Sequence, residues 1–126
     1  MNVVDSSAWL CWIADDENAQ HFARPILDVD SLLIPTITLT EVFKSMLRQT
    51  NETQAMRALT LMKQGKLVPL DDELAVDAAV YGTQLSLPLA DSIVYATARR
   101  HGAMLWTQDG DFRDLPGVTF FAREPL

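Results

Sequence analysis

Cysteine is almost absent from this chain, and its scarcity narrows the kinds of site that the protein can contain. Cys11 is the only cysteine among 126 residues, which excludes an internal disulfide and a pair of thiolates for a metal. Histidine is also rare, and His21 and His101 both fall in predicted helices, where we interpret them as structural or solvated. A zinc site built on cysteine and histidine is therefore not expected.

Long hydrophobic runs are missing as well. No stretch approaches the roughly 18–20 apolar residues that a membrane-spanning helix needs, although 48% of the residues are apolar. The first residues, Met1 to Asp5, place no basic region before an apolar run, unlike a secretory signal. Together with the single cysteine, these features predict a cytoplasmic protein whose residues 1–126 form one domain with a full core.

Basic residues are few, with 10 Lys and Arg against 17 Asp and Glu and a formal net charge of −7. Proteins that hold a phosphate backbone usually present a basic surface. An acidic chain can still act on phosphate when a bound divalent cation reverses the local charge. The charge balance therefore directs attention to the acids themselves.

Apolar strand patterns alternate with helical patterns along the whole chain. Strands are predicted at about 2–5, 31–34, 66–69, 103–107 and 118–121, and helices at about 8–13, 18–28, 38–50, 52–64, 71–84 and 91–101. Strands separated by helices need crossover connections, and nearly unbroken apolar strands are buried on both sides. The pattern predicts an α/β fold with a mostly parallel central sheet flanked by helices.

Four acids fall where the carboxyl ends of the predicted strands meet the following segments. They are Asp5, Glu41, Asp91 and Asp109. Ligands of open α/β sheets bind beyond the carboxyl ends of the strands, so we expect these four side chains to face one edge of the sheet.

Each acid also has an ordinary structural explanation. Thr38 and Glu41 match a capping box, in which the glutamate reaches back to the amide of the threonine. Asp91 would cap its own helix, and Asp109 would form a tight turn with the glycine after it. Asp5 would cap the helix that follows, toward residue 7 or 8, although an acid ending a buried strand is costly unless it is paired, capped or bound to metal.

As a set, the four acids are more informative than any one of them. Converging carboxylates repel one another, which raises some of their pKa values unless a cation is present. Mg²⁺ suits such a site because it prefers oxygen ligands and accepts a few carboxylates together with water and phosphate. Mn²⁺ prefers the same kind of ligand and is a plausible substitute.

The chain resembles PIN-domain nucleases, and especially the VapC-type toxins of toxin–antitoxin pairs, over essentially its whole length. Four segments carry the resemblance: Val3-Val4-Asp5-Ser6-Ser7, Thr38-Leu39-Thr40-Glu41-Val42, the stretch from Leu89 to Ala98 around Asp91, and the stretch from Leu105 to Phe112 around Asp109. The resemblance implies a three-layer PIN-like fold and a Mg²⁺-dependent endoribonuclease that acts as a toxin. It also implies a cognate antitoxin as partner, an RNA substrate and a homodimer.

The resemblance further implies a role for each acid. Asp5 and Asp91 would be the central metal ligands, with Glu41 and Asp109 completing the acidic pocket and one of these two taking a proton from water.

Ser7 and Thr107 would orient carboxylates or water around this pocket. Asp111 competes with Asp109 for the fourth position. We favour Asp109, which lies nearer the strand end, and expect Asp111 to cap the short turn around Phe112.

Two further features concern the binding of RNA and of a partner protein. Lys44 and Arg48 follow Glu41 on one helical face and are candidates for contacts with RNA phosphates, or are simple solubilising charges. The helix over residues 8–13 is apolar on every side, so Trp9 or Trp12, with Phe22, would either join the core or receive a partner helix.

Three other functions compete with this interpretation. A haloacid-dehalogenase-like phosphatase needs a second aspartate two residues after the first, where this chain has Ser7. A receiver domain needs a lysine late in the chain, whereas the last lysine here is Lys66. A catalytically silent PIN-like interaction module would not need all four acids.

Overall fold

A computed structural model describes residues 1–123, and its centre is a five-stranded sheet in which every pair of neighbouring strands is parallel. The strands lie in the order β3-β2-β1-β4-β5 and are β1 (Asn2–Val4), β2 (Leu32–Pro35), β3 (Lys66–Val68), β4 (Met104–Thr107) and β5 (Val118–Phe120). The helices are α1 (Ser6–Ala14), α2 (Ala19–Leu27), α3 (Thr36–Gln49), α4 (Glu52–Met62), α5 (Asp72–Leu85) and α6 (Leu89–Arg100), with short 3₁₀ turns η1 (Val29–Ser31) and η2 (Gly110–Phe112). The predicted α/β fold with a parallel sheet is confirmed.

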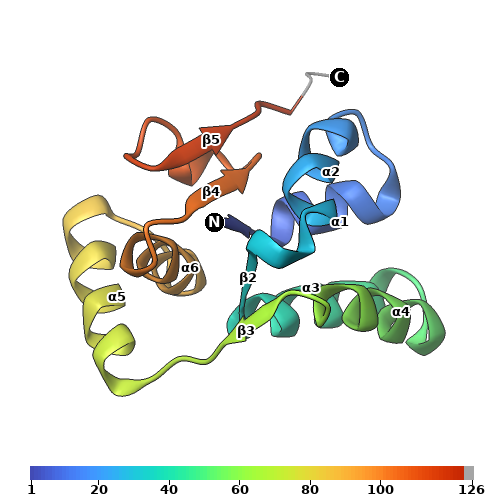
Figure 1. Ribbon diagram of the computed structural model, residues 1–126, viewed down its shortest axis with the longest axis horizontal. Helices are drawn as coiled ribbons and strands as arrows, with labels where there is room; N and C mark the ends of the chain where they lie inside the picture. The colour runs from blue at the N-terminus through green and yellow to red at the C-terminus, as the bar shows by residue number, and fades with distance from the viewer. Residues whose placement is uncertain (124–126) are drawn as a thin grey trace.

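The helices cover both faces of the sheet, which gives three layers (Figure 1). Successive strand residues point to opposite faces. Val4 and Ile34 accordingly pack into a core with α1 to α4, whereas Val3, Leu33 and Leu105 pack against α6 and the inner side of α5. The unbroken apolar strands of the sequence thus serve two cores at once.

Helix α6 is the most deeply embedded helix beside the sheet. All seven residues from Ser92 to Ala98 are buried, and small side chains among them let the helix lie close to the strands. The Tyr95 hydroxyl donates to the carbonyl of Pro116 at 2.9 Å. Gly102, at φ +59°, ends the helix in the left-handed conformation that glycine adopts without strain.

The order of the strands defines where a site can form. The chain runs outward from β1 to β2 and β3, then returns to place β4 on the other side of β1. The carboxyl ends of β1 and β4 therefore meet at the switch point, the usual place for a ligand crevice in open α/β sheets. Asp5 follows β1 there, and Thr107 is the last residue of β4.

Two predicted helix starts are wrong. Helix α3 begins at Thr36, because Pro35 closes strand β2 with extended backbone and leads directly into the helix. Thr38 therefore lies inside α3, where its hydroxyl is buried without a hydrogen-bond partner, and the capping box with Glu41 does not form. Helix α6 starts at Leu89, so Asp91 lies within its first turn and does not cap it.

The tryptophans of α1 belong largely to the interior. Trp9 is 1% exposed and Phe22 is fully buried, so neither can receive a partner helix. Trp12 is half-buried and packs edge-on against Trp9, with ring centroids 6.0 Å apart. Within residues 1–123, no helix has the length and apolar character needed to cross a bilayer.

Candidate metal centre

Asp5 is the most tightly held acid of the site. It is only 3% exposed, and its carboxylate accepts hydrogen bonds from the Thr107 hydroxyl at 2.6 Å, the Ser7 hydroxyl at 2.8 Å and the amide of Ala8 at 3.0 Å. Asp5 thus caps α1, as the structural explanation of this residue predicted. Burial raises the pKa of Asp5 to about 6 despite these hydrogen bonds, and the charge of Asp109 adds to the rise.

Thr107 connects two of the acids through one hydroxyl. Its oxygen donates to Asp5 and accepts from the backbone amide of Asp109 at 2.9 Å. Because Thr107 is fully buried, this oxygen has a fixed position. The side chain of Asp5 and the backbone of Asp109 are therefore held in one geometry.

Three carboxylates of the site lie close together. Asp91, Asp109 and Asp111 each offer one oxygen, and these oxygens all lie within 4.8 Å of one another. Burial, followed by the charges of Asp109, Asp5, Glu41 and Asp111, raises the pKa of Asp91 to about 7. The repulsion expected from converging acids is therefore centred on α6.

Asp111 belongs to this group and does not cap the turn around Phe112, so that prediction is wrong. The 3₁₀ turn η2 begins at Gly110, which makes Asp109 its capping residue, and the Asp109 carboxylate accepts from the amide of Asp111 at 2.9 Å. An aspartate commonly accepts from an amide two residues further on. Both carboxylates therefore lie in the cluster, and the preference for Asp109 as the fourth ligand stays a prediction.

Glu41 lies half-buried in the second turn of α3 and interacts with the same acids. Burial raises its pKa most, a hydrogen bond from Ser6 lowers it, and the charge of Asp109 raises it again. Sequence order separates Asp5, Glu41, Asp91 and Asp109 widely, yet the structure brings all four within electrostatic range of one another.

The donor set fits a hard divalent cation. The clustered ligand atoms are carboxylate oxygens, which Mg²⁺ and Mn²⁺ prefer, and Cys11, a softer donor, is buried in the α1 core. A cation among these oxygens would also relieve the repulsion that raises the pKa of Asp91.

The predicted phosphate contacts lie further along α3. Lys44 and Arg48 are exposed beyond Glu41, and neither forms an ion pair within the described part of the chain. They border a shallow hollow of about 610 Å³ whose apolar side chains include Phe43 and Leu47.

Two amide side chains next to the site were missed by sequence reasoning. Gln108 separates Thr107 from Asp109, and Asn18 donates to its side-chain oxygen at 3.2 Å. Nothing in the sequence signals this pairing, because 90 residues separate the two positions.

Comparisons with known proteins identify the family of the chain and relate its fold to solved structures. A family model described as the PIN domain matches residues 3–118, whereas a search of curated protein sequences finds no match. A toxin–antitoxin complex from Klebsiella pneumoniae is similar in structure, with a TM-score of 0.79 and 21% identity over 94% of this chain and 96% of that one.

Two other solved structures have the same fold. VapC20 from Mycobacterium tuberculosis, a toxin that cleaves the sarcin-ricin loop, aligns with a TM-score of 0.78 and 17% identity over 94% of this chain and 97% of that one. VapBC2 from Rickettsia felis, bound to a fragment of its promoter DNA, aligns with a TM-score of 0.73 and 12% identity over 96% and 97%. Since the family model spans nearly the whole parallel sheet and every acid of the cluster, the chain belongs to the PIN domain family.

Proposed function

We propose that this protein is a Mg²⁺-dependent endoribonuclease that hydrolyses RNA phosphodiester bonds and acts as the toxin of a toxin–antitoxin pair. The observation that carries the proposal is the meeting of Asp91, Asp109 and Asp111 within 4.8 Å at the switch point of a parallel sheet. Membership of the PIN domain family supports it.

The residues of the cluster divide the chemistry between them. A bound Mg²⁺ supplies a water of lowered pKa and neutralises charge on the phosphate oxygens. Asp91, Asp109 and Asp111 would hold the ion, and Asp5 would join them from its fixed position against Thr107.

Glu41 is our candidate for the group that takes the proton from the attacking water. Its pKa is raised, which brings it closer to a working pH near neutrality. It also lies on a different element from the three clustered aspartates, so it can contact water without giving up a ligand to the ion. Asp109 is the second candidate for this proton transfer.

The RNA strand needs cations beyond the metal. Lys44 and Arg48 lie one and two helical turns after Glu41 on α3, so they are placed to contact phosphates that flank the scissile bond. Both side chains are exposed, so they are free to contact the RNA when it binds.

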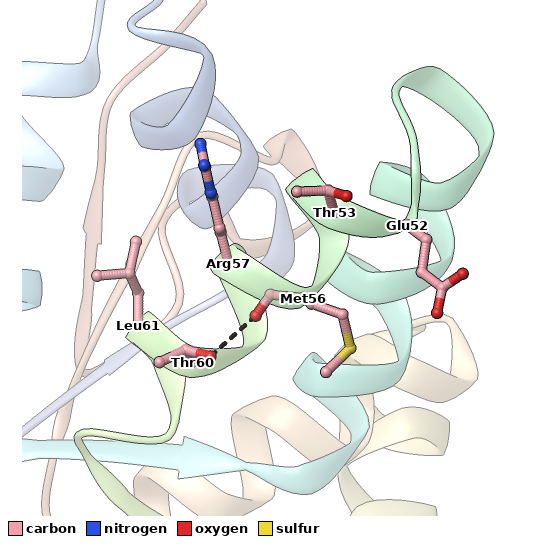
Figure 2. A pocket seen from close by; sticks show the side chains of 6 residues that line it. All are labelled: Glu52, Thr53, Met56, Arg57, Thr60 and Leu61. Atoms are coloured by element: carbon pink, nitrogen blue, oxygen red, sulfur yellow. Dashed lines mark hydrogen bonds between the residues drawn. The ribbon is translucent and has the colours of Figure 1, made fainter.

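A partner surface is available on the outer side of the α3–α4 hairpin. Leu47, Met56 and Leu61 are 44%, 47% and 41% exposed there. Figure 2 shows Met56, Arg57 and Leu61 projecting from α4 around a shallow hollow of about 720 Å³. Exposed apolar side chains beside cations suit a protein partner, and we propose that the antitoxin or a second copy of the chain covers them. The similarity to the Klebsiella pneumoniae toxin–antitoxin complex supports the antitoxin.

The test is cleavage of a single-stranded RNA by the purified protein with Mg²⁺, with EDTA and with Mn²⁺. We expect cleavage with either ion, none in EDTA, and none of a DNA strand of the same base sequence. Asp91→Asn should abolish cleavage while the protein stays folded. A wild-type protein that binds Mn²⁺ but leaves every RNA intact would instead support a silent interaction module.

A further inference from the structure

We propose that Asn18 is a positioning residue of the metal centre, which holds Asp5 in its ligating geometry through Gln108 and Ser7. The catalytic consequence of this inference rests on the proposed nuclease function, whereas its effect on metal affinity does not.

Asn18 occupies a helix-capping position without acting as a cap. It precedes the first residue of α2, and asparagine is among the best residues for accepting a helix amide there. Its side chain nevertheless makes no capping hydrogen bond, and its backbone, at φ −87° and ψ 2°, departs from the extended conformation usual at this position. A side-chain cap normally stabilises a helix, so the Asn18 side chain gives up a local stabilising bond and contacts more distant groups instead.

The distant partners lie in two segments. The Asn18 amide nitrogen donates to the carbonyl of Ala122 at 3.0 Å, to the side-chain oxygen of Gln108 at 3.2 Å and more weakly to the carbonyl of Phe121 at 3.5 Å. Asn18 is 9% exposed, so water competes little for these bonds. One amide therefore joins the segment after β5 to the loop that carries Asp109.

Gln108 passes this constraint toward Asp5. Its side-chain amide donates to the carbonyl of Ser7 at 3.4 Å, and its backbone amide lies at the same distance from the Ser7 hydroxyl. That hydroxyl donates to the Asp5 carboxylate at 2.8 Å. The path from Asn18 to Asp5 thus consists of consecutive hydrogen bonds, and Gln108 is also the residue between Thr107 and Asp109.

The far end of the path is firmly fixed. The Phe121 ring stacks on His21, with centroids 4.2 Å apart and an interplanar angle of 3°, and meets Phe22 edge-on at 5.7 Å. The Phe121 amide also donates to the carbonyl of Thr107 at 3.0 Å. Residues 121 and 122 lie beyond the family match, which ends at residue 118.

The chemistry requires an amide at position 18. Its three acceptors are all oxygens, so only a donor can sit among them. Asn18→Asp keeps the size of the side chain but places an oxygen against these oxygens and adds charge. Gln108→Glu keeps the oxygen that accepts from Asn18 and removes the nitrogen that donates to Ser7. Gln20→Glu, which adds the same charge at an exposed amide two residues from Asn18, is the matched control.

The experiment measures Mn²⁺ affinity by calorimetry, cleavage kinetics on a short RNA, and melting temperature in EDTA, for Asn18→Asp, Gln108→Glu and their double variant. Residues that orient metal ligands typically change metal affinity or activity by about 10–100-fold. We expect Mn²⁺ binding to weaken by about 10-fold in each single variant, kcat to fall with KM nearly unchanged, and the double variant to resemble the singles. Gln20→Glu should behave as wild type.

Unchanged Mn²⁺ affinity in a folded Gln108→Glu protein would overturn the inference, even if Asn18→Asp lowers the melting temperature, because Asn18 would then only anchor the chain end. Additive losses in the double variant would overturn it as well. If the variants lose Mn²⁺ affinity but wild-type protein cleaves no RNA, the positioning role stands and the nuclease proposal fails.

Discussion

The two helical hairpins beside the sheet, α3–α4 and α5–α6, carry opposite charges and expose different surfaces. Residues 36–66 contain five Lys and Arg and two Asp and Glu, for a net charge of +3, whereas residues 69–102 contain two and five, for −3. An acidic chain thus concentrates positive charge in its α3–α4 hairpin. Figure 1 shows the two hairpins on opposite sides of the strands.

The α5–α6 hairpin satisfies much of its charge internally. The Arg100 guanidinium lies 3.2 Å from Asp71, 3.2 Å from Asp77 and 3.6 Å from Glu73. Its inner helix is buried and presents Asp91 to the candidate metal centre. This hairpin therefore supports a site residue from a rigid, self-paired element.

The α3–α4 hairpin leaves its cations available. Lys44, Arg48 and Arg57 form no ion pair within residues 1–123, and exposed Leu47 and Met56 lie among them. We therefore expect substitutions on the first turn of α6 to affect the chemistry, and those on the outer face of α3–α4 to affect binding. The following predictions test that division.

Asp91→Asn should give the largest effect. Removing this carboxylate takes a ligand from the cluster, so we expect RNA cleavage to fall by at least about 100-fold, the upper end of the range for residues that only orient metal ligands. The melting temperature in EDTA should stay the same or rise, because Asp91 is the acid most strongly repelled by its neighbours. Asp77→Asn, on the same hairpin, should cleave normally. Retained cleavage with lost stability would contradict the proposed role.

The metal-free protein should lose stability between about pH 4 and pH 7. Asp5 and Asp91 have folded-state pKa values of about 6 and about 7, above the ordinary 3.8, so their stabilisation is present below pH 4 and is lost as pH rises through the folded values. The rise at Asp5 corresponds to about 3 kcal/mol at 1.36 kcal/mol per unit. The half-buried Asp91 contributes less per unit.

Denaturant unfolding of chelator-treated protein at pH 5 and pH 8, compared with Asp5→Asn, checks this slope. The Asp5→Asn variant should lose most of this pH dependence. At pH 8, Mg²⁺ should restore the stability of the wild-type protein by binding its folded state.

Asp71, which caps α5, acts in the opposite direction. Its pKa is lowered by the Leu74 amide and Arg100, so its contribution is present above pH 4 and is lost as pH falls further. If the wild-type protein becomes more stable relative to Asp5→Asn between pH 5 and pH 8, the raised pKa of Asp5 would be contradicted.

Reversing two cations on α3 should have a moderate effect. We expect the double variant Lys44→Glu with Arg48→Glu to raise KM for RNA by about 10-fold at low salt, with kcat little changed. The affinity for RNA should also depend less on salt, because a protein that makes fewer phosphate contacts releases fewer counterions on binding. Arg24→Glu, an exposed cation on α2, is the control. An equal rise in KM for that control would show that net charge alone is responsible.

Arg100→Ala should have the smallest effect. Its ion pairs are partly exposed, and such pairs are usually worth about 0–1 kcal/mol each. We expect thermal or denaturant unfolding to report a loss of about 1 kcal/mol, with RNA cleavage unchanged. A drop of several kcal/mol, or a loss of cleavage, would mean that this ion-pair cluster positions α6 and Asp91.

Much of the fold follows from local sequence. The strands around Val3, Leu33 and Leu105 are short and mostly apolar, which is typical of parallel strands buried on both faces, and their order along the chain implies helical crossovers. The exceptions are at element ends. Pro35 is the last residue of strand β2, one residue beyond the predicted end, because it still pairs with Val68 in the sheet.

The site was only partly predictable. Acids near strand ends pointed to one edge of the sheet, but each had a competing local explanation. For Asp5 the capping explanation is correct, and the same residue still belongs to the acidic cluster. Asp109 and not Asp111 caps the 3₁₀ turn, and both carboxylates lie in the cluster, which sequence spacing cannot show because it depends on where the turn begins.

The sequence by itself determined that this is a parallel α/β domain whose acids lie near the carboxyl ends of its strands, since periodicity and strand order are local properties. Only the tertiary structure decided that Asp91, Asp109 and Asp111 form the close group, that Trp9 is core, and that Asn18 reaches Gln108 from 90 residues away. Those outcomes depend on how helices pack around the sheet. Packing sums many distant contacts, and no short stretch of the chain encodes it.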